Sequence, residues 1–219
     1  MKPIVVIDYG YGNLHSIMKA FAHVGSPVRL AQDPSDLADA PAAILPGVGA
    51  FGEGMEGLRS RGFETPIREY AASGKPLLGV CLGMQFLFTE SEEFGLHKGL
   101  DLIPGRVERF PAPTADDGIN YKIPHMGWNS LLKPNAGTGW SDSIFRHIKE
   151  GDEVYFVHSF VAVPASPGAV LAQTAYGGNR VTAAVRSGNI FGCQFHPEKS
   201  RETGLSIIRA FAASCGSLG

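Results

Sequence analysis

The chain has 219 residues, a formal net charge of −2 at pH 7 and 44% hydrophobic residues. This length and apolar share are typical of a globular protein with a sizeable core, so we expect a single domain over residues 1–219. The near-neutral charge, without a basic tract, argues against a nucleic-acid partner. The N-terminal apolar run ends at Asp8, too early for a signal peptide or a membrane span, so we expect a cytoplasmic protein without membrane contact.

The first part of the chain alternates short apolar runs with amphipathic segments. Strands are expected at residues 4–7, 28–30, 43–45 and 76–80, and helices at 14–21, 67–71 and 82–88. Such alternation is typical of βαβ units, which build a mostly parallel sheet covered by helices on both faces.

The second part has closely spaced strand patterns instead. They lie at residues 154–161, 169–175, 181–185 and 189–195, with a turn sequence at Gly177-Gly178. A last helix is expected from about Arg201 to Ala213. The two parts together predict a three-layer α/β fold in which an antiparallel strand segment is added to a mostly parallel central sheet.

The segment from Gly79 to Gln85, GVCLGMQ, joins a predicted strand to a predicted helix. Its G-x-C-x-G pattern is the thiol counterpart of the G-x-S-x-G nucleophile elbow, whose sharp turn leaves no room for side chains two positions away from the nucleophile. The turn places Cys81 at a helix N-terminus, where a thiolate is stabilised and the N–H of Leu82 can donate to an oxyanion. A free cysteine is more often a small buried hydrophobe, but the elbow favours a nucleophile.

A second motif ends the last predicted strand with His196-Pro197-Glu198. Pro197 is expected to prevent a helix from starting and to keep His196 extended. Residues i and i+2 of an extended chain point the same way, so His196 can face Cys81 with one ring nitrogen and donate to Glu198 with the other. The alternative is a strand-end histidine beside a solvated glutamate. The combination with the elbow favours a catalytic triad of Cys81, His196 and Glu198.

The remaining cysteines have no comparable context. Cys193 lies three residues before His196, so strand alternation points it to the opposite face, into the core. The sequence holds no CxxC, HExxH or Walker A motif, and we therefore expect neither a metal site nor a cofactor.

Residues 47–52, GVGAFG, match the G-x-G-x-x-G pattern of dinucleotide-binding loops. That interpretation needs an acidic residue at the end of the next strand, which here ends in Val80-Cys81. We favour a loop of exposed N–H groups beside the nucleophile, in which Gly49 is the second oxyanion-hole donor and leaves space for the substrate.

These motifs resemble those of the triad-type glutamine amidotransferases. Over nearly the whole chain, the sequence is similar to the glutaminase subunits of imidazole glycerol phosphate synthases. The matching stretches are DYGYGNL (8–14), PGVGAF (46–51), GVCLGMQ (79–85), PHMGWN (124–129), YFVHS (155–159) and FHPEKS (195–200). The first and fourth stretches, with Lys199-Ser200, point to this kind of subunit within the wider family.

The resemblance implies that glutamine is hydrolysed to glutamate and ammonia through a thioester on Cys81. It implies further that the amino-acid end of glutamine is held by Gln85, Ser159 and Phe160, although Phe160 stands where we expect a tyrosine. The implied partner is a cyclase subunit, a (β/α)8 barrel that forms a heterodimer with the chain and uses the ammonia to make imidazole glycerol phosphate and AICAR in histidine biosynthesis. The residues implied to face it are Asn13, Trp128, Tyr155 and Lys199.

Alternatives remain for the partner-facing residues and for the function. Asn13 can be a turn residue that tolerates left-handed geometry, Trp128 a core residue and Lys199 a solvated lysine. The chain can serve another synthase, in pyridoxal phosphate, purine or anthranilate synthesis, which its partner would reveal. It can also be a thiol peptidase, which needs an extended peptide groove, or a non-catalytic binding module.

Overall fold

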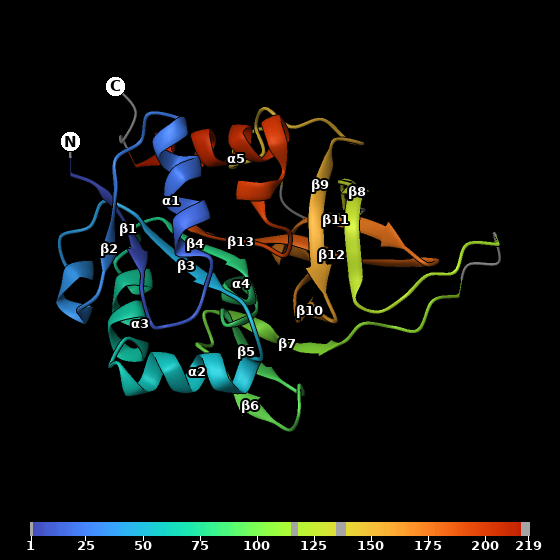
Figure 1. The fold of residues 1–219 in the computed structure, drawn as a ribbon, viewed down its shortest axis with the longest axis horizontal. Coiled ribbons are helices and arrows are strands. Elements are labelled where there is room, and N and C mark those ends of the chain that lie inside the picture. Colours follow the sequence, from blue (N-terminus) through green and yellow to red (C-terminus); the bar gives the residue numbers. More distant parts are fainter. Residues whose placement is uncertain (1, 115–117, 135–138, 216–219) are drawn as a thin grey trace.

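The computed structural model describes residues 2–114, 118–134 and 139–215 (Figure 1). Its largest sheet has seven strands, in the spatial order β11 (Val170–Tyr176), β12 (Asn179–Ser187), β13 (Ile190–Cys193), β4 (Leu77–Cys81), β3 (Ala43–Gly47), β1 (Ile4–Ile7) and β2 (Val28–Ala31). The strands from β13 to β2 are parallel, whereas β11 and β12 pair in the antiparallel sense. This confirms the predicted antiparallel segment on a mostly parallel sheet.

Helices cover both faces of this sheet, which confirms the three layers (Figure 1). One face carries α1 (Leu14–His23) and α5 (Arg201–Ser214), and the other carries α2 (Phe51–Ser60) and α3 (Glu64–Ala72), while the short α4 (Leu82–Gln85) follows β4. Alternate residues of β1 belong to the two opposite core clusters, Ile4 and Val6 to one, Val5 and Ile7 to the other. Both sides of the strand are buried, which explains its continuous apolar run.

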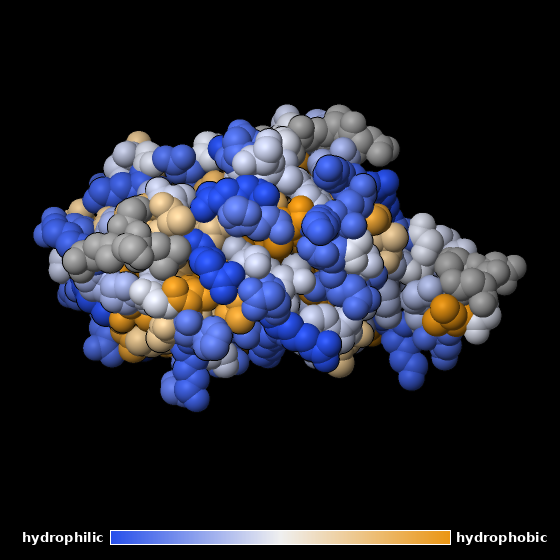
Figure 2. Space-filling view, turned by 90° about the horizontal axis from the view of Figure 1, so that it is seen from above, coloured by the Kyte–Doolittle hydropathy of each residue, from blue (hydrophilic) through white to orange (hydrophobic). Residues whose placement is uncertain are grey.

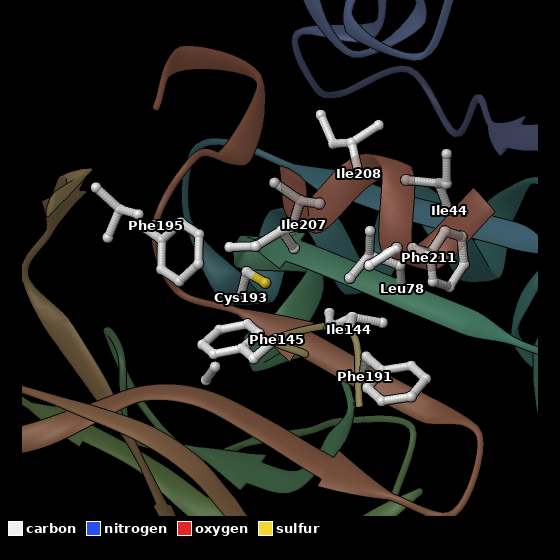
Figure 3. Close-up of a cluster of buried hydrophobic side chains, with 14 of the residues drawn as sticks. Ile44, Leu78, Ile144, Phe145, Phe191, Cys193, Phe195, Ile207, Ile208 and Phe211 are labelled. Atoms are coloured by element: carbon white, nitrogen blue, oxygen red, sulfur yellow. The ribbon is translucent and has the colours of Figure 1, made fainter. Parts of the chain in front are cut away.

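The core between the sheet and α5 surrounds Cys193. Figure 3 shows this side chain among Phe145, Phe195 and Ile207. Cys193 is fully buried, and burial raises the pKa of its thiol. The prediction that Cys193 is a core residue is confirmed, and its protonated state makes it a poor nucleophile.

Two smaller sheets complete the fold. One has the order β10 (Phe160–Pro164), β7 (Ile103–Arg109), β5 (Phe88–Ser91) and β6 (His97–Lys98), and the other pairs β8 (His125–Ser130) with β9 (Glu153–His158). The predicted strand at 154–161 is therefore wrong as a single element, because the chain changes sheets at Ser159. The predicted helix at 82–88 ends at Gln85, because Phe88 pairs with Ile103 of β7. Short apolar runs suit a helix and a strand alike, and the available partner decides.

Within the described ranges, no helix is both long and apolar enough to cross a bilayer. Figure 2 views the molecule from the side of α1 and α5, where hydrophilic residues cover most of the face and hydrophobic ones form small areas.

The turn between β4 and α4 is as tight as its glycine pattern predicts. Cys81 has a φ of 54°, in the left-handed region that side chains rarely adopt. A Cβ atom on Gly83 would lie 1.8 Å from the carbonyl oxygen of Leu45, and one on Gly79 would lie 2.6 Å from that of Gly83. Only glycine at both positions lets the turn pack against β3.

We expect Gly83→Ala to lower the free energy of unfolding by at least about 2 kcal/mol, because the added methyl group must displace backbone atoms. Gly168→Ala is the matched control, since a Cβ atom there meets only the Ser166 hydroxyl at 3.4 Å. Urea unfolding followed by circular dichroism measures both, and the control should change by less than about 0.5 kcal/mol. Equal stabilities of the two variants would contradict the tight packing.

Candidate active site

Three side chains meet where neighbouring parallel strands end. Cys81 is the last residue of β4, and His196 follows β13, which pairs with β4 in parallel. The Cys81 thiol interacts with the His196 ring and is one of the causes that raise the pKa of the ring. Its Nδ1 atom lies 2.8 Å from Oε1 of Glu198. The structure therefore brings together the three residues proposed from the sequence as a triad.

The His-Pro-Glu motif reaches this geometry by a route that differs from the expected one. His196 is extended, with φ −98° and ψ 97°, but Pro197 begins a 3-10 helix (Pro197–Lys199). The expectation that Pro197 prevents a helix is wrong, because proline is tolerated in a first helical turn, where its missing N–H needs no acceptor. The turn carries Glu198 back towards the ring. The backbone N–H of His196 donates to the Tyr155 carbonyl at 3.0 Å and anchors the segment.

The triad is almost completely buried, and burial strengthens the electrostatic interactions between its side chains. The His196 and Glu198 side chains are 4% and 1% exposed. Burial by itself lowers the pKa of His196, but hydrogen bonds to Cys81 and Glu198, and the charges of both, outweigh it and raise this pKa to about 10. Oε2 of Glu198 is buried without a hydrogen-bond partner among the described residues. The ring therefore holds a proton at neutral pH and has one carboxylate oxygen to orient it.

A cavity of about 330 Å³ opens beside Cys81. This volume lies at the lower end of the range of about 300–1,000 Å³ for small-molecule sites, which suits a ligand of amino-acid size. The lining residues are Val48, Gly49, Cys81, Leu82, Gln85, Glu93, Pro124, Val157, His158, Ser159, Phe160 and His196. The predicted oxyanion-hole and substrate-binding residues thus all line one cavity with the nucleophile.

Two backbone positions beside Cys81 suit an oxyanion hole. Leu82 is the first residue of α4, so its N–H has no acceptor within the helix. Gly49 has a φ of +98°, and a Cβ atom built there would meet no atom within 4 Å. The open space at Gly49 lets a substrate approach the backbone.

Gln85 is held in one orientation. Its Nε2 atom donates to the Phe160 carbonyl at 3.2 Å and to Oε1 of Gln194 at 3.0 Å. These bonds use both amide hydrogens, so Gln85 can offer only its oxygen to a ligand. Gln194, whose Nε2 lies 3.9 Å from the Cys81 sulfur, was missed in the sequence, although strand alternation places it on the same face as His196.

Glu93 is a second residue that sequence analysis missed. Its Oε2 atom accepts a hydrogen bond of 2.6 Å from the N–H of Phe51, the first residue of α2. Burial raises the pKa of this carboxyl group. In a dinucleotide-binding protein, the helix N-terminus after the G-x-G-x-x-G loop binds the pyrophosphate. Here the Glu93 carboxyl group occupies the N-terminus of α2, which argues against a dinucleotide-binding site. The pair Glu92-Glu93 resembles any solvated acidic pair, so no sequence signal marked it.

The four predicted partner-facing residues lie on or near the surface. Trp128 and Tyr155 are opposite each other on β8 and β9, with ring centroids 6.0 Å apart. Trp128 is 38% exposed and therefore not a core residue, and the guanidinium carbon of Arg201 lies 4.4 Å from its ring centroid. Lys199 is exposed.

Asn13 begins α1 as its N-cap. Its side chain accepts a hydrogen bond of 3.4 Å from the N–H of Ser16. Its φ of −87° shows that the left-handed alternative for this residue is wrong.

Within residues 2–114, 118–134 and 139–215, no group of three or more His, Cys, Asp or Glu side chains is arranged to hold a metal ion.

Comparison with known proteins adds close relatives. Three examples are subunits HisH of imidazole glycerol phosphate synthase. For each, the identity is given first, then the share of this chain that is covered, and then the share of the relative that is covered. They come from Legionella pneumophila strain Paris (HisH 1; 47% identity, 96% and 99%), Syntrophotalea carbinolica (48%, 95% and 98%) and Geobacter metallireducens (47%, 98% and 99%).

Solved structures are similar at lower identity. A crystal structure of a glutamine amidotransferase has a TM-score of 0.71 and 20% identity, covering 97% of this chain and 98% of its own. PurLQS of Thermotoga maritima has a TM-score of 0.69 and 22% identity, covering 98% and 99%. At such identities the likeness establishes the fold alone.

The family model of class-I glutamine amidotransferases matches residues 5–215. Since this match spans almost the whole chain and relatives reach 48% identity, the chain belongs to the class-I glutamine amidotransferase family.

Proposed function

We propose that the protein is the glutaminase subunit of an imidazole glycerol phosphate synthase. It hydrolyses glutamine to glutamate and ammonia and delivers the ammonia to a cyclase subunit in histidine biosynthesis. The observation that carries the chemistry is the buried Cys81, His196 and Glu198 cluster beside a cavity of amino-acid size. The HisH relatives favour this synthase over those of pyridoxal phosphate, purine or anthranilate synthesis. The chain would act as one domain in the cytoplasm.

The reaction begins with attack of the Cys81 thiolate on the side-chain amide carbon of glutamine. The tetrahedral oxyanion is stabilised by the N–H groups of Gly49 and Leu82, each typically worth about 3 kcal/mol. His196 gives its proton to the departing ammonia and leaves a thioester. The same ring then takes a proton from water, which attacks the thioester and releases glutamate. Glu198 orients the ring throughout.

The other cavity groups fit the amino-acid end of glutamine. The carboxylate of Glu93 and the oxygen of Gln85 are acceptors suited to the α-ammonium group. Ser159 and Phe160 contribute backbone groups. Phe160 stands where a tyrosine is expected and has no hydroxyl to offer. The cavity is small, whereas a thiol peptidase needs an extended groove for its substrate.

The partner face lies next to the triad. Ammonia is protonated in bulk water at neutral pH and then loses its nucleophilicity, so it has to be handed over nearby. Tyr155 and Trp128 are opposite each other in the β8–β9 sheet, and the Tyr155 carbonyl bonds to the backbone of His196. With Asn13 and Lys199, they would contact the (β/α)8 barrel of the cyclase in a heterodimer.

Replacing Cys81 by Ser should lower glutamine hydrolysis at least about 10³-fold, because a hydroxyl beside His196 is a much weaker nucleophile than a thiolate. Ammonia-dependent synthesis by the complex should persist. Cys193→Ala is the control, since its buried thiol has no part in the reaction, and it should remain active. Glutamate release from glutamine measures both, and full activity of Cys81→Ser would refute the proposal.

The pKa of His196 gives a second prediction. Because it is about 10 in the folded protein and about 6.5 in an unfolded chain, the protonated ring stabilises the fold fully below pH 6.5, and this contribution is lost as the pH rises through about 10. An NMR titration of the ring should show this raised pKa. In Cys81→Ser the pKa should fall, since the thiol is one of its causes. A midpoint near 6.5 in the wild-type protein would contradict the assignment.

The cyclase, with its acceptor nucleotide, should stimulate glutamine hydrolysis about 5- to 150-fold, the range that typical coupling energies between two sites produce.

Trp128→Ala should weaken cyclase binding by about tenfold or more, because an exposed aromatic ring is removed from the interface. Glu69→Ala, exposed on α3, is the control and should bind normally. Titration calorimetry measures affinity, and unchanged turnover on adding cyclase and nucleotide would exclude the coupling.

A further inference from the structure

Two buried histidines connect the β8–β9 sheet to the wall of the cavity. His125 of β8 and His158 of β9 are directly opposite each other and are 1% and 6% exposed. Nδ1 of His125 lies 3.0 Å from Nε2 of His158. Neither ring has a part in the chemical steps above, so the reason for burying two titratable side chains here lies elsewhere.

The hydrogen-bond partners determine where the proton of His158 lies. Its Nδ1 is 2.9 Å from the carbonyl oxygen of Phe160, which can only accept, so Nδ1 carries hydrogen. Burial lowers the pKa of His158 to about 3, although the hydrogen bond to the Phe160 carbonyl acts in the opposite direction, so the ring is neutral. Its Nε2 is therefore an acceptor, and it accepts from Nδ1–H of His125.

The same argument applies one step further from the cavity. Burial lowers the pKa of His125 to about 4, so its Nε2 is bare and faces Nδ2 of Asn129 at 3.4 Å. The orientation of the Asn129 amide is set independently, because Nδ2 also donates to the Ala175 carbonyl at 2.7 Å and Oδ1 accepts from the N–H of Ser130. Every donor in this row therefore points towards the cavity wall.

Aromatic rings hold the histidines in place. His125 is stacked against Phe156 at 4.7 Å and against Tyr176 at 4.0 Å between centroids. Phe110 contacts both histidines, at 5.8 Å from His125 and 5.3 Å from His158. The rings thus have little freedom to turn and exchange their donor and acceptor atoms.

The row ends on the group that orients a cavity residue. The Phe160 carbonyl accepts from Nδ1 of His158 and also from Nε2 of Gln85. Together with Oε1 of Gln194, this oxygen turns the nitrogen of the Gln85 amide to the wall, so that the amide presents its oxygen to a ligand. Loss of the His158 donor would free the carbonyl and leave Gln194 as the one remaining acceptor that orients Gln85 among the described residues.

We propose that His125 and His158 are positioning residues: as a neutral pair with all donors in one direction, they orient the Phe160 carbonyl and thereby Gln85, and so set the affinity for glutamine. The inference rests on the proposed function, in which Gln85, Ser159 and Phe160 hold the amino-acid end of the substrate. The pair acts through other residues and does not touch the reacting atoms.

The proton positions can be tested without any activity. In the full chain labelled with ¹⁵N-histidine, two-bond ¹⁵N–¹H correlation spectra at pH 6–8 should show both rings as the Nδ1–H tautomer, which is the minor form of free neutral histidine. Assignment comes from single His125→Phe and His158→Phe variants. An Nε2–H tautomer at either ring, or titration near pH 6.5, would overturn the proposal.

The effect on glutamine binding is tested in the complex with the cyclase. His158→Phe keeps the ring packing but removes the donor, and should raise KM for glutamine at least tenfold while kcat changes less than threefold. In His158→Asn the amide N–H can replace Nδ1–H, so KM should stay within threefold of the wild-type value. A purely structural role would affect both variants alike and would lower kcat or thermal stability, and equal KM values would overturn the inference.

A further variant covers the case in which His158→Phe does not fold. His125→Phe preserves the stacking on Phe156 and Tyr176 and removes the donor to His158 together with the acceptor that faces Asn129. KM should rise about three- to tenfold, and an unchanged KM would overturn the inference. Failure of these tests alongside an inactive Cys81→Ser variant would reject the positioning and leave the proposed function standing. Full activity of Cys81→Ser would reject the proposed function, whatever the tautomers.

Discussion

The parallel pairing of β4 with β13 is the interaction on which the site depends. It places the ends of two strands that are distant in sequence side by side, so that the Cys81 thiol and the His196 ring interact. The glycine turn after β4 then positions the thiol, since it holds Cys81 in a left-handed backbone conformation at the N-terminus of α4. The packing of Gly83 against β3 keeps that strained conformation in place.

The site contains histidine in two different protonation states. His196 and His158 both line the cavity and are both buried. His196 faces a thiol and a carboxylate, and these partners raise its pKa to about 10 despite burial. His158 faces a carbonyl oxygen and a second histidine, so burial prevails and lowers its pKa to about 3. A protonated ring suits proton transfer, whereas a neutral ring with one fixed tautomer suits the orientation of neighbouring groups.

Strand β9 connects these two histidines to the proposed partner face. Its Tyr155 bonds to the His196 backbone and stands opposite the half-exposed Trp128. Its last residue, His158, bonds to the cavity wall at Phe160. The β8–β9 sheet is therefore joined by short, direct hydrogen bonds both to the backbone of the triad histidine and to the cavity wall.

The sequence by itself determined the nucleophile elbow, the His-Pro-Glu motif, the alternation of strands and helices and the core position of Cys193, because each depends on residues close together in the chain. Only the tertiary structure decided that the strand at 154–161 divides at Ser159, that Phe88 begins a strand, that Glu93 lines the cavity, and that Gln194 bonds to Gln85. It alone decided the proton direction through His125 and His158. These features depend on which distant segment supplies a hydrogen-bond partner, and the local hydrophobic periodicity of the sequence does not identify that segment.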